Sequence, residues 1–215
     1  VFPVLAQQSI RELNLTGRTY EDVLSDASWA VFQEGYTSGF GADGDHLKTA
    51  DEVKMALGCG YTMITLDCSE HIDNEAAGLP ADEINRRYLK VPEETRENLE
   101  SKYLGKEFTL KKGTKIVFDT EEFKKIVLVY KDTITFTAEI YESLIKTCGR
   151  NIDFEMSIDE TLTPTTPESH YFVASELIDA GVETTSLAPR FCGEFQKGID
   201  YIGDIAQFEK EFKIH

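Results

Sequence analysis

Cysteines are scarce in this sequence, and the short motifs that identify a common ligand are missing. The four cysteines, at positions 59, 68, 148 and 192, form no CxxC or Cys/His finger spacing, which excludes a zinc finger. They are also too sparse for a secreted disulfide scaffold, so we expect reduced thiols and a cytoplasmic location. The GxxxxGK[ST], HExxH and HxH patterns are absent, and no glycine motif supports a nucleotide site.

Cationic charge and long apolar runs are also scarce. The chain carries 22 Lys and Arg against 39 Asp and Glu, a net charge of -17. Nucleic acid and anionic membranes need a cationic surface, so we expect neither as a partner. An anionic ligand would need a local arginine or a metal ion to hold it. The longest apolar run, Ile126–Tyr130, is far too short to span a bilayer.

What is present is an ordinary globular composition, 41% hydrophobic and 28% charged over 215 residues. This length suits one large domain or two small ones. The sequence begins with VFPVLAQQ, without a Met, and ends with FEKEFKIH inside a predicted helix. We therefore expect a segment of a longer protein, folded as a single domain over residues 1–215.

Hydrophobic patterning predicts alternating strands and helices. Short apolar or β-branched runs predict strands at residues 2–6, 61–67, 154–159 and 184–191, and a short strand or loop at 39–46. Helical spacing predicts helices at residues 19–34, 49–57, 167–180 and 204–214. Residues 120–147 contain strand-like pieces, but their apolar residues recur every three or four positions, and we expect one long helix there.

Residues 70–118 interrupt this alternation. They are polar and rich in charge, which indicates an insertion with one or two short helices and a small β piece near residues 107–118. Outside it, strands that alternate with crossover helices predict parallel strands and an α/β class. About five strands are too few for a closed barrel of eight, so we expect an incomplete TIM-type (β/α) barrel. An open doubly wound α/β sheet is the alternative.

Polar and charged residues follow nearly every predicted strand. Because the carboxyl ends of parallel strands share one edge of a sheet, these residues should converge there. The candidates are Gln7, Gln8 and Arg11; Asp43, Asp45 and His46; Asp67, Glu70 and His71; Asp159, Glu160 and Thr163; and Arg190 and Glu194. Each also has a structural explanation, since an acidic residue after a strand often caps the next helix.

Two stretches are the most informative. GFGADGDH, residues 39–46, gathers glycines, aspartates and a histidine, and His46 with carboxylates from other strands would suit a metal ion. SIDETLTPTTP, residues 157–167, places Asp159 and Glu160 before a loop that two prolines rigidify. Glu34 ends a helix, where a negative charge is unfavourable, and this position is a weak indication of function.

At these residues the sequence resembles the tagaturonate epimerases, the UxaE family of bacterial hexuronate catabolism. The resemblance is carried by residues 4–46, by YTMITLDCSEH at 61–71, by FEMSIDETLTPTTPESHYFVASEL at 154–177 and by residues 187–215. It covers more than half of the chain in the expected order. It implies a metal-dependent α/β-barrel isomerase, roughly twice this length, that interconverts D-tagaturonate and D-fructuronate.

This implied activity suggests roles for the candidates. The two uronates differ at a carbon β to the ketone, so simple enolisation cannot invert it, and retro-aldol cleavage with re-addition is favoured. We expect a divalent metal ion at His46 and Glu160, with Asp45 as a third ligand, and Asp159 or Glu34 as the base. Arg190 would hold the substrate carboxylate, while Gln7, Gln8 and Thr163 would bind the substrate.

Other functions stay open at this point. One alternative is a metal-dependent ketose epimerase or aldolase on a similar barrel. Another is a non-catalytic fragment that binds sugar. An unfilled edge of an incomplete barrel also favours association, so a homo-oligomer is possible.

Overall fold

The computed structural model describes residues 3–196 and 198–215 of the chain. Contacts divide it into two compact units, which are described separately below. The first comprises Val1–Glu70, Phe136–Ser157 and Ala180–Ala188, and the second His71–Thr135, Ile158–Asp179 and Pro189–His215. The predicted insertion at 70–118 falls almost entirely within the second unit.

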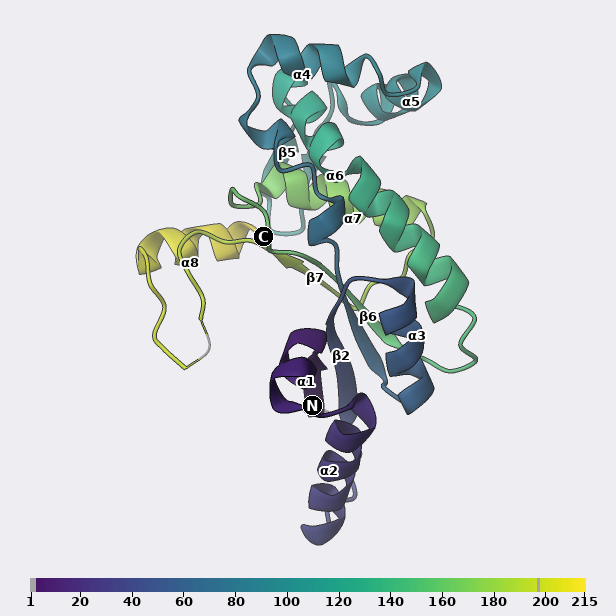
Figure 1. The fold of residues 1–215 in the computed structure, drawn as a ribbon. Coiled ribbons are helices and arrows are strands. Elements are labelled where there is room, and N and C mark those ends of the chain that lie inside the picture. The colour runs from purple at the N-terminus through teal and green to yellow at the C-terminus, as the bar shows by residue number, and fades with distance from the viewer. Residues whose placement is uncertain (1–2, 197) are drawn as a thin grey trace. The chain divides into compact units, whose positions relative to one another are not determined.

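Helices and strands alternate along the chain, as Figure 1 shows. The strands are β1 (Val4–Ser9), β2 (Gly41–Leu47), β3 (Met63–Asp67), β4 (Glu107–Thr109), β5 (Lys115–Val117), β6 (Asp153–Ile158) and β7 (Ser186–Pro189). The helices are α1 (Ile10–Thr16), α2 (Tyr20–Gln33), α3 (Ala50–Cys59), α4 (Ala81–Tyr88), α5 (Glu93–Tyr103), α6 (Thr120–Ile140), α7 (Pro167–Asp179) and α8 (Ile205–Ile214). The short helical turns are η1 (Ser69–His71), η2 (Ala76–Gly78) and the π-helical η3 (Tyr141–Ile145).

The first unit is built on a five-stranded sheet with the order β1-β2-β3-β6-β7. Parallel pairing joins β1 to β2, β2 to β3 and β3 to β6. The predicted α/β class with about five parallel strands is therefore confirmed. The strands follow one another in chain order, without the reversal that marks a doubly wound sheet. Within the described residues the sheet is not closed, so the structure by itself does not establish a barrel.

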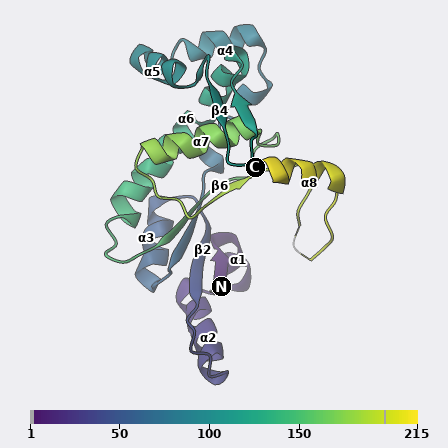
Figure 2. The same cartoon turned by 180° about the vertical axis from the view of Figure 1, so that it is seen from behind.

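One face of this sheet packs against helices. Ala42, Ile64, Leu66, Phe154 and Met156 are fully buried or nearly so and alternate with polar residues along their strands. Both views place α3 beside the sheet (Figures 1 and 2). A Cβ on Gly44 would lie 3.0 Å from the Cβ of Ala56 in α3, so glycine allows the helix to approach β2 closely. The opposite face is left to the polar side chains.

Local sequence signals set most helix boundaries. Thr19 and Thr49 begin α2 and α3 as N-caps, each with an acidic side chain three residues later that completes a capping box. Both predicted helices are confirmed, as are α6, α7 and α8. We did not predict α1, although Ser9 and Glu12 form the same capping box at its start.

The stretch Gly39–Gly44 has the GxGxxG spacing of a dinucleotide fingerprint, but its setting is different. The fingerprint joins the end of a strand to a helix, whereas here the glycines lead into β2. The predicted short strand or loop at 39–46 is a strand. Its glycines serve the turn at Gly39, which has a φ of 82°, and the close approach at Gly44.

The second unit contains α4, α5, the β4–β5 hairpin, the first part of α6, α7 and α8. The predicted short helices and small β piece of the insertion are confirmed by α4, α5 and the antiparallel hairpin. Tyr103 of α5 lies at the centre of an aromatic cluster with ring centroids 5.1–5.9 Å away. The cluster partners are Phe108, Phe118, Phe123 and Phe172. This unit therefore has its own core.

Candidate functional site: a polar face on the parallel sheet

Each strand of the five-stranded sheet contributes one polar side chain to a continuous row across the sheet. We call this the polar row, and its members are Gln7, Asp43, Thr65, Glu155 and Ser186. Gln7 Nε2 donates to Asp43 Oδ2 at 3.3 Å, and Thr65 Oγ1 lies 3.2 Å from both carboxylate oxygens of Asp43. Thr65 Oγ1 is also 3.5 Å from Glu155 Oε1, and Ser186 Oγ donates to Glu155 Oε2 at 2.5 Å.

The row follows from the period of a strand. Successive side chains point to opposite faces, so Asp43 and Thr65 face away from the helices that cover Gly44 and Ile64. Pairing sets Gln7 opposite Asp43 and Thr65 opposite Glu155. The sheet therefore presents polar groups from distant parts of the sequence on one surface.

Asp43 is a buried carboxyl group of the row with a perturbed pKa. Its side chain is buried, with 2% of the residue exposed. Burial, and then the neighbouring charge of Asp45, raise the pKa of Asp43 from 3.8 to about 6, against the opposing effect of hydrogen bonds from Thr65 and Gln7. Perturbed carboxyl groups of this kind are enriched in functional sites, though structural networks also produce them.

Further polar groups lie one step closer to the carboxyl ends of the strands. Asp45, Asp67 and Ser157 are buried there. The carboxylate of Asp67 accepts from the backbone N–H of Ser69 at 2.8 Å and forms an ion pair with Lys48 at 3.3 Å. Asp45 and Asp67 were among the residues predicted at this edge, and the convergence of the other candidates stays a prediction.

The backbone of His46, the residue after Asp45, has an unusual conformation. Its φ of 53° lies in the left-handed region, which costs free energy for a residue with a side chain. The pairing of β2 with β3 shifts register between Gly44 and Leu47, as in a β-bulge. Asp45 Oδ1 and His46 Nδ1 are 2.7 Å apart, so the carboxylate fixes the orientation of the imidazole ring.

The structure brings some predicted residues together and separates others. Gln7, Asp45 and His46 lie on or beside the polar face. Gln8 is the neighbour of Gln7 and points to the opposite face, where its Oε1 is buried without a hydrogen bond in the described structure. Glu34 is exposed at the C-cap of α2, before β2 begins, and is not brought to the polar row. Its catalytic role stays a prediction.

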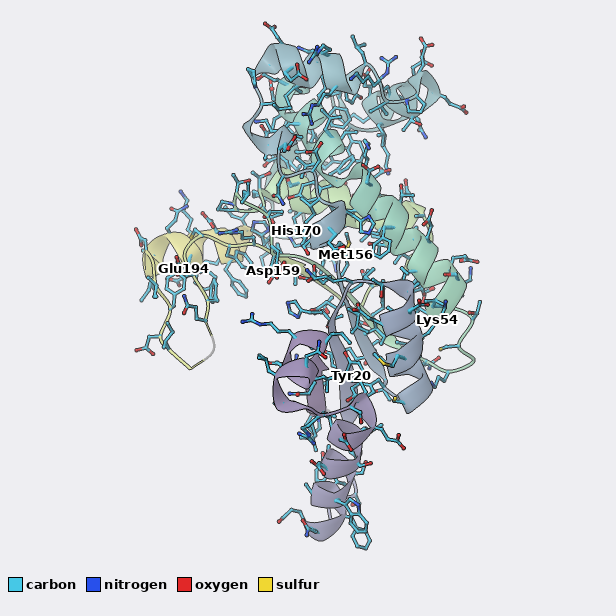
Figure 3. All side chains as sticks on the ribbon, in the orientation of Figure 1. Tyr20, Lys54, Met156, Asp159, His170 and Glu194 are labelled. Carbon is cyan, nitrogen blue, oxygen red and sulfur yellow. The ribbon has the colours of Figure 1, made fainter. Side chains whose placement is uncertain are left out.

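Asp159, Glu160, Thr163 and Arg190 belong to the second unit. Asp159 lies in the stretch after β6 (Figure 3). Arg190 is joined to this stretch, since its guanidinium donates to the carbonyl of Thr161 and its backbone N–H donates to Thr165 Oγ1 at 3.0 Å. The predicted roles of these residues stay predictions.

A metal site formed by His46, Glu160 and Asp45 also stays a prediction. Among residues 3–196 and 198–215, no group of three or more His, Cys, Asp or Glu side chains is arranged to hold a metal ion. Two of the predicted ligands are in the first unit and Glu160 is in the second. The contact between Asp45 and His46 is the part of this prediction that the structure describes.

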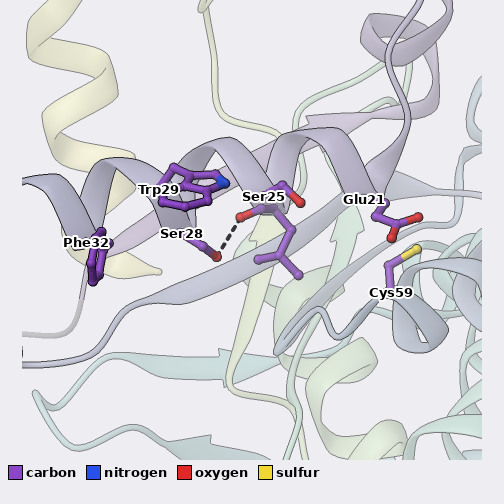
Figure 4. A pocket seen from close by; sticks show the side chains of 7 residues that line it. Glu21, Ser25, Ser28, Trp29, Phe32 and Cys59 are labelled. Carbon is purple, nitrogen blue, oxygen red and sulfur yellow. Dashed lines mark hydrogen bonds between the residues drawn. The ribbon is translucent and has the colours of Figure 1, made fainter.

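A hollow lined by α2 and by Cys59 of α3 has a different character from the polar row (Figure 4). Trp29 and Phe32 are 64% and 76% exposed, and their rings meet edge to face with centroids 5.8 Å apart. Glu21, Ser25, Ser28 and Cys59 complete its wall with Leu24. This groove is mainly apolar, whereas the polar row gathers groups that can bind hydroxyls and carry protons.

Sequence reasoning missed most of the polar row. Thr65, Glu155 and Ser186 were not among the predicted site residues, and Asp43 was considered without being chosen. The signal was present, because Thr65 with Asp67 and Glu155 with Ser157 alternate with apolar residues in strands that we expected to be buried. Polar residues at every second position of such strands indicate a shared polar face.

Two other findings concern the chain as a whole. None of the helices in the described part of the chain is long and apolar enough to cross a membrane. All four cysteines lie in this part and are free thiols. A homo-oligomer and the absence of nucleic-acid partners stay predictions.

A five-stranded parallel sheet with its strands in chain order and with helices packed against it defines an α/β protein. The sequence model of the UxaE family, described as tagaturonate epimerase, matches residues 1–215. The chain belongs to the UxaE tagaturonate epimerase family.

Proteins of known name and structure resemble the chain along its whole length. It is 47% identical over 215 residues to a tagaturonate/fructuronate epimerase of Thermotoga maritima and covers 44% of that protein. Crystal structures of the fructuronate-tagaturonate epimerase UxaE of Cohnella laeviribosi, one native and one with glycerol, match it with a TM-score of 0.97. Their identities are 58% and 59%, and the match covers all of this chain and 44% of theirs. The chain thus spans less than half the length of these relatives.

Proposed function

We propose that this chain carries part of the active site of an isomerase that interconverts D-tagaturonate and D-fructuronate in hexuronate catabolism. The observation that carries the proposal is the polar row, which crosses all five strands of the parallel sheet on the face opposite α3. Membership of the UxaE family and the names of the relatives support the choice of substrate. The amides, hydroxyls and carboxylates of this face suit a polyhydroxylated acid.

The chemistry that fits this substrate is retro-aldol cleavage and re-addition. A base removes the proton from the hydroxyl on the carbon to be inverted. The bond from this carbon towards the ketone breaks, and its electron pair moves to the ketone oxygen to give an enolate and an aldehyde. The aldehyde rotates, the enolate adds to its other face, and the proton returns to the new alkoxide. No external oxidant or reductant is consumed.

We also propose that the sheet forms one wall of a TIM-type barrel in proteins of the length of the relatives. The strands follow in chain order, as they do around a barrel, and the polar groups share one face. In a barrel this face would line the interior, and the carboxyl ends of the strands would surround the active site.

A divalent metal ion at His46 is part of this proposal, and the contact of His46 with Asp45 supports it. A metal-binding histidine is commonly oriented by a carboxylate at its second ring nitrogen, and Asp45 holds His46 Nδ1 in this way. His46 and Glu160 would hold the metal ion, and Asp45 would orient His46 or bind as a third ligand. The bound ion would supply positive charge for the enolate oxygen.

Arg190 and the two glutamines are proposed to bind the substrate. A guanidinium can hold the substrate carboxylate through two parallel hydrogen bonds, which would offset the repulsion from a net charge of -17. Gln7 is placed to bind a hydroxyl, because its amide already belongs to the polar row. Thr163 and Gln8 are kept as further candidates.

The test uses the complete gene product that contains these residues. Incubation with D-tagaturonate should yield D-fructuronate, and the reverse reaction should also proceed, as followed by chromatography. His46→Ala and Glu160→Gln should each lower the bound metal content and reduce turnover by about 10²-fold or more.

An exposed charge on α8 supplies a control: Lys213→Ala should leave the bound metal content and the turnover unchanged. Unchanged metal content and turnover in His46→Ala and Glu160→Gln would remove both residues from the site. Net formation of three-carbon products would indicate an aldolase instead, and sugar binding without turnover a non-catalytic protein.

A further inference from the structure

Each oxygen of the Glu155 carboxylate has a neutral hydroxyl group within 3.5 Å, and the hydroxyl of Thr65 lies closer still to Asp43, 3.2 Å from each of its carboxylate oxygens. Ser186 on β7 is 2.5 Å from Oε2, and Thr65 on β3 is 3.5 Å from Oε1. Glu155 lies on β6 between these strands, and each neighbouring strand supplies one hydroxyl. The carboxylate therefore has a fixed place in the middle of the polar face.

Hydroxyl partners suit a group that must change its protonation state. A hydroxyl donates to a carboxylate and can turn to accept from a carboxylic acid, so the contacts of Glu155 survive both states. An ammonium or guanidinium partner can only donate and would oppose protonation. Asp67 is in that situation, because Lys48 pairs with its Oδ2 at 3.3 Å.

The other carboxyl groups of this face are less suited to meet a substrate. Asp43 is 2% exposed and Asp45 is 6% exposed, and the carboxylate of Asp45 is engaged by His46. Glu155 is only half-buried, so part of its side chain is accessible. Within the described first unit, it combines access with neutral hydroxyl partners on both oxygens.

We propose that Glu155 is the catalytic residue that takes the substrate hydroxyl proton and returns it, with Thr65 and Ser186 as positioning residues. This inference rests on the proposed epimerase function and refines its mechanism. In the forward step the proton moves from the substrate hydroxyl to Glu155 while the carbon–carbon bond breaks and the ketone oxygen becomes an enolate. In the second step the new carbon–carbon bond forms, and Glu155 returns the same proton to the alkoxide.

This assignment differs from both bases expected from the sequence. Asp159 is in the second unit, and Glu34 is at the C-cap of α2, remote in the chain from the carboxyl end of any strand. Glu155 has a defined pair of hydrogen-bond partners from the neighbouring strands. A base must be positioned to within hydrogen-bonding reach of the proton that it removes, so this placement is what qualifies Glu155.

The test compares Glu155→Gln with variants of its two partners in the complete gene product. Glu155→Gln keeps the size of the side chain but cannot accept the proton, so kcat should fall by about 10²- to 10⁴-fold with little change in KM. Thr65→Val and Ser186→Ala should lower kcat by about tenfold and shift the acidic limb of the kcat pH profile. Thr65→Ser, which restores the hydroxyl, should recover most of the activity.

A matched control distinguishes the positioning role from general damage to the fold. Thr62 is exposed just before β3, and its hydroxyl contacts the backbone of Ala42 outside the polar row. Thr62→Val should therefore leave the kcat pH profile unchanged. The inference is overturned if Glu155→Gln retains kcat within about threefold, or if Thr65→Val loses thermal stability while its pH profile stays the same. A wild-type protein without epimerase activity would instead contradict the proposed function.

Discussion

At the scale of single residues, backbone freedom and close packing decide what β2 can be. Gly44 is buried between the sheet and α3, and an added Cβ would lie within 3.0–3.3 Å of Ala56, Leu47 and Ile64. His46 follows with a positive φ, after which Leu47 returns to the helix-covered side. The sequence GADGDH therefore combines a packing requirement at its glycine with a strained position at its histidine.

The packing requirement gives a prediction with an internal control. Gly44→Ala should lower the free energy of unfolding by about 1–3 kcal/mol, because the methyl group overpacks the contact with α3. Gly58, near the end of α3, has open space around it, so Gly58→Ala should raise the free energy of unfolding by up to about 1 kcal/mol. Urea unfolding of both variants measures whether the two changes in free energy of unfolding have opposite signs. Equal changes would contradict the close contact between Gly44 and α3.

At the scale of elements, α7 and α8 are linked by two histidines within the second unit. His170 Nδ1 and His215 Nδ1 are 2.8 Å apart, and their rings stack with centroids at 5.1 Å (Figure 3 labels His170). A hydrogen bond between two imidazoles needs one nitrogen without a proton, so at least one ring is neutral. Burial lowers the pKa of both histidines, and His170 falls to about 4.

This pair predicts a loss of stability in acid. Because the folded pKa of His170 lies below its unfolded value of 6.5, its contribution is present above pH 6.5 and is lost as the pH falls towards 4. The difference in free energy of unfolding between His170→Gln and the wild type should therefore shift in favour of the variant, by about 1 kcal/mol, when the pH is lowered from 8 to 5. Urea midpoints at both pH values measure this, with His71→Gln as the control.

At the scale of the whole molecule, the dominant quantity is the net charge of -17. Charge of one sign destabilises a compact state through self-repulsion, and salt screens this repulsion over distances of about 8–10 Å. The same charge opposes an anionic substrate. To hold the sugar acid proposed as its substrate, the polar face would need local positive charge from a residue or a metal ion.

This excess of negative charge predicts a dependence on salt. The midpoint of thermal unfolding should rise between 0.02 and 0.5 M sodium chloride, by roughly 2–5 °C. Differential scanning calorimetry at pH 8 measures the change, and a neutral osmolyte at equal osmolality is the control. A midpoint that falls with salt would mean that ion pairs such as Lys102 with Glu176 outweigh the global repulsion.

The sequence by itself determined the order of elements and the class of the fold. Helical spacing, capping residues and terminal glycines are local signals, because a helix is held by contacts within a few residues. They sufficed for α2, α3, α6, α7 and α8, and short apolar or β-branched runs indicated the strands of the sheet, with residues 39–46 left open as a strand or a loop. The predicted set omitted α1. Family membership also followed from the sequence, since long matching stretches need no coordinates.

Only the tertiary structure decided which polar residues meet. Gln7, Asp43, Thr65, Glu155 and Ser186 are distant in sequence, and their hydrogen bonds depend on the register between strands and on which face the helices cover. Our predictions instead favoured residues just after the strands, such as Glu160, and Glu34 at the end of a helix. Register and facing are long-range properties of the packed sheet, and a shift of one residue moves every side chain to the other face.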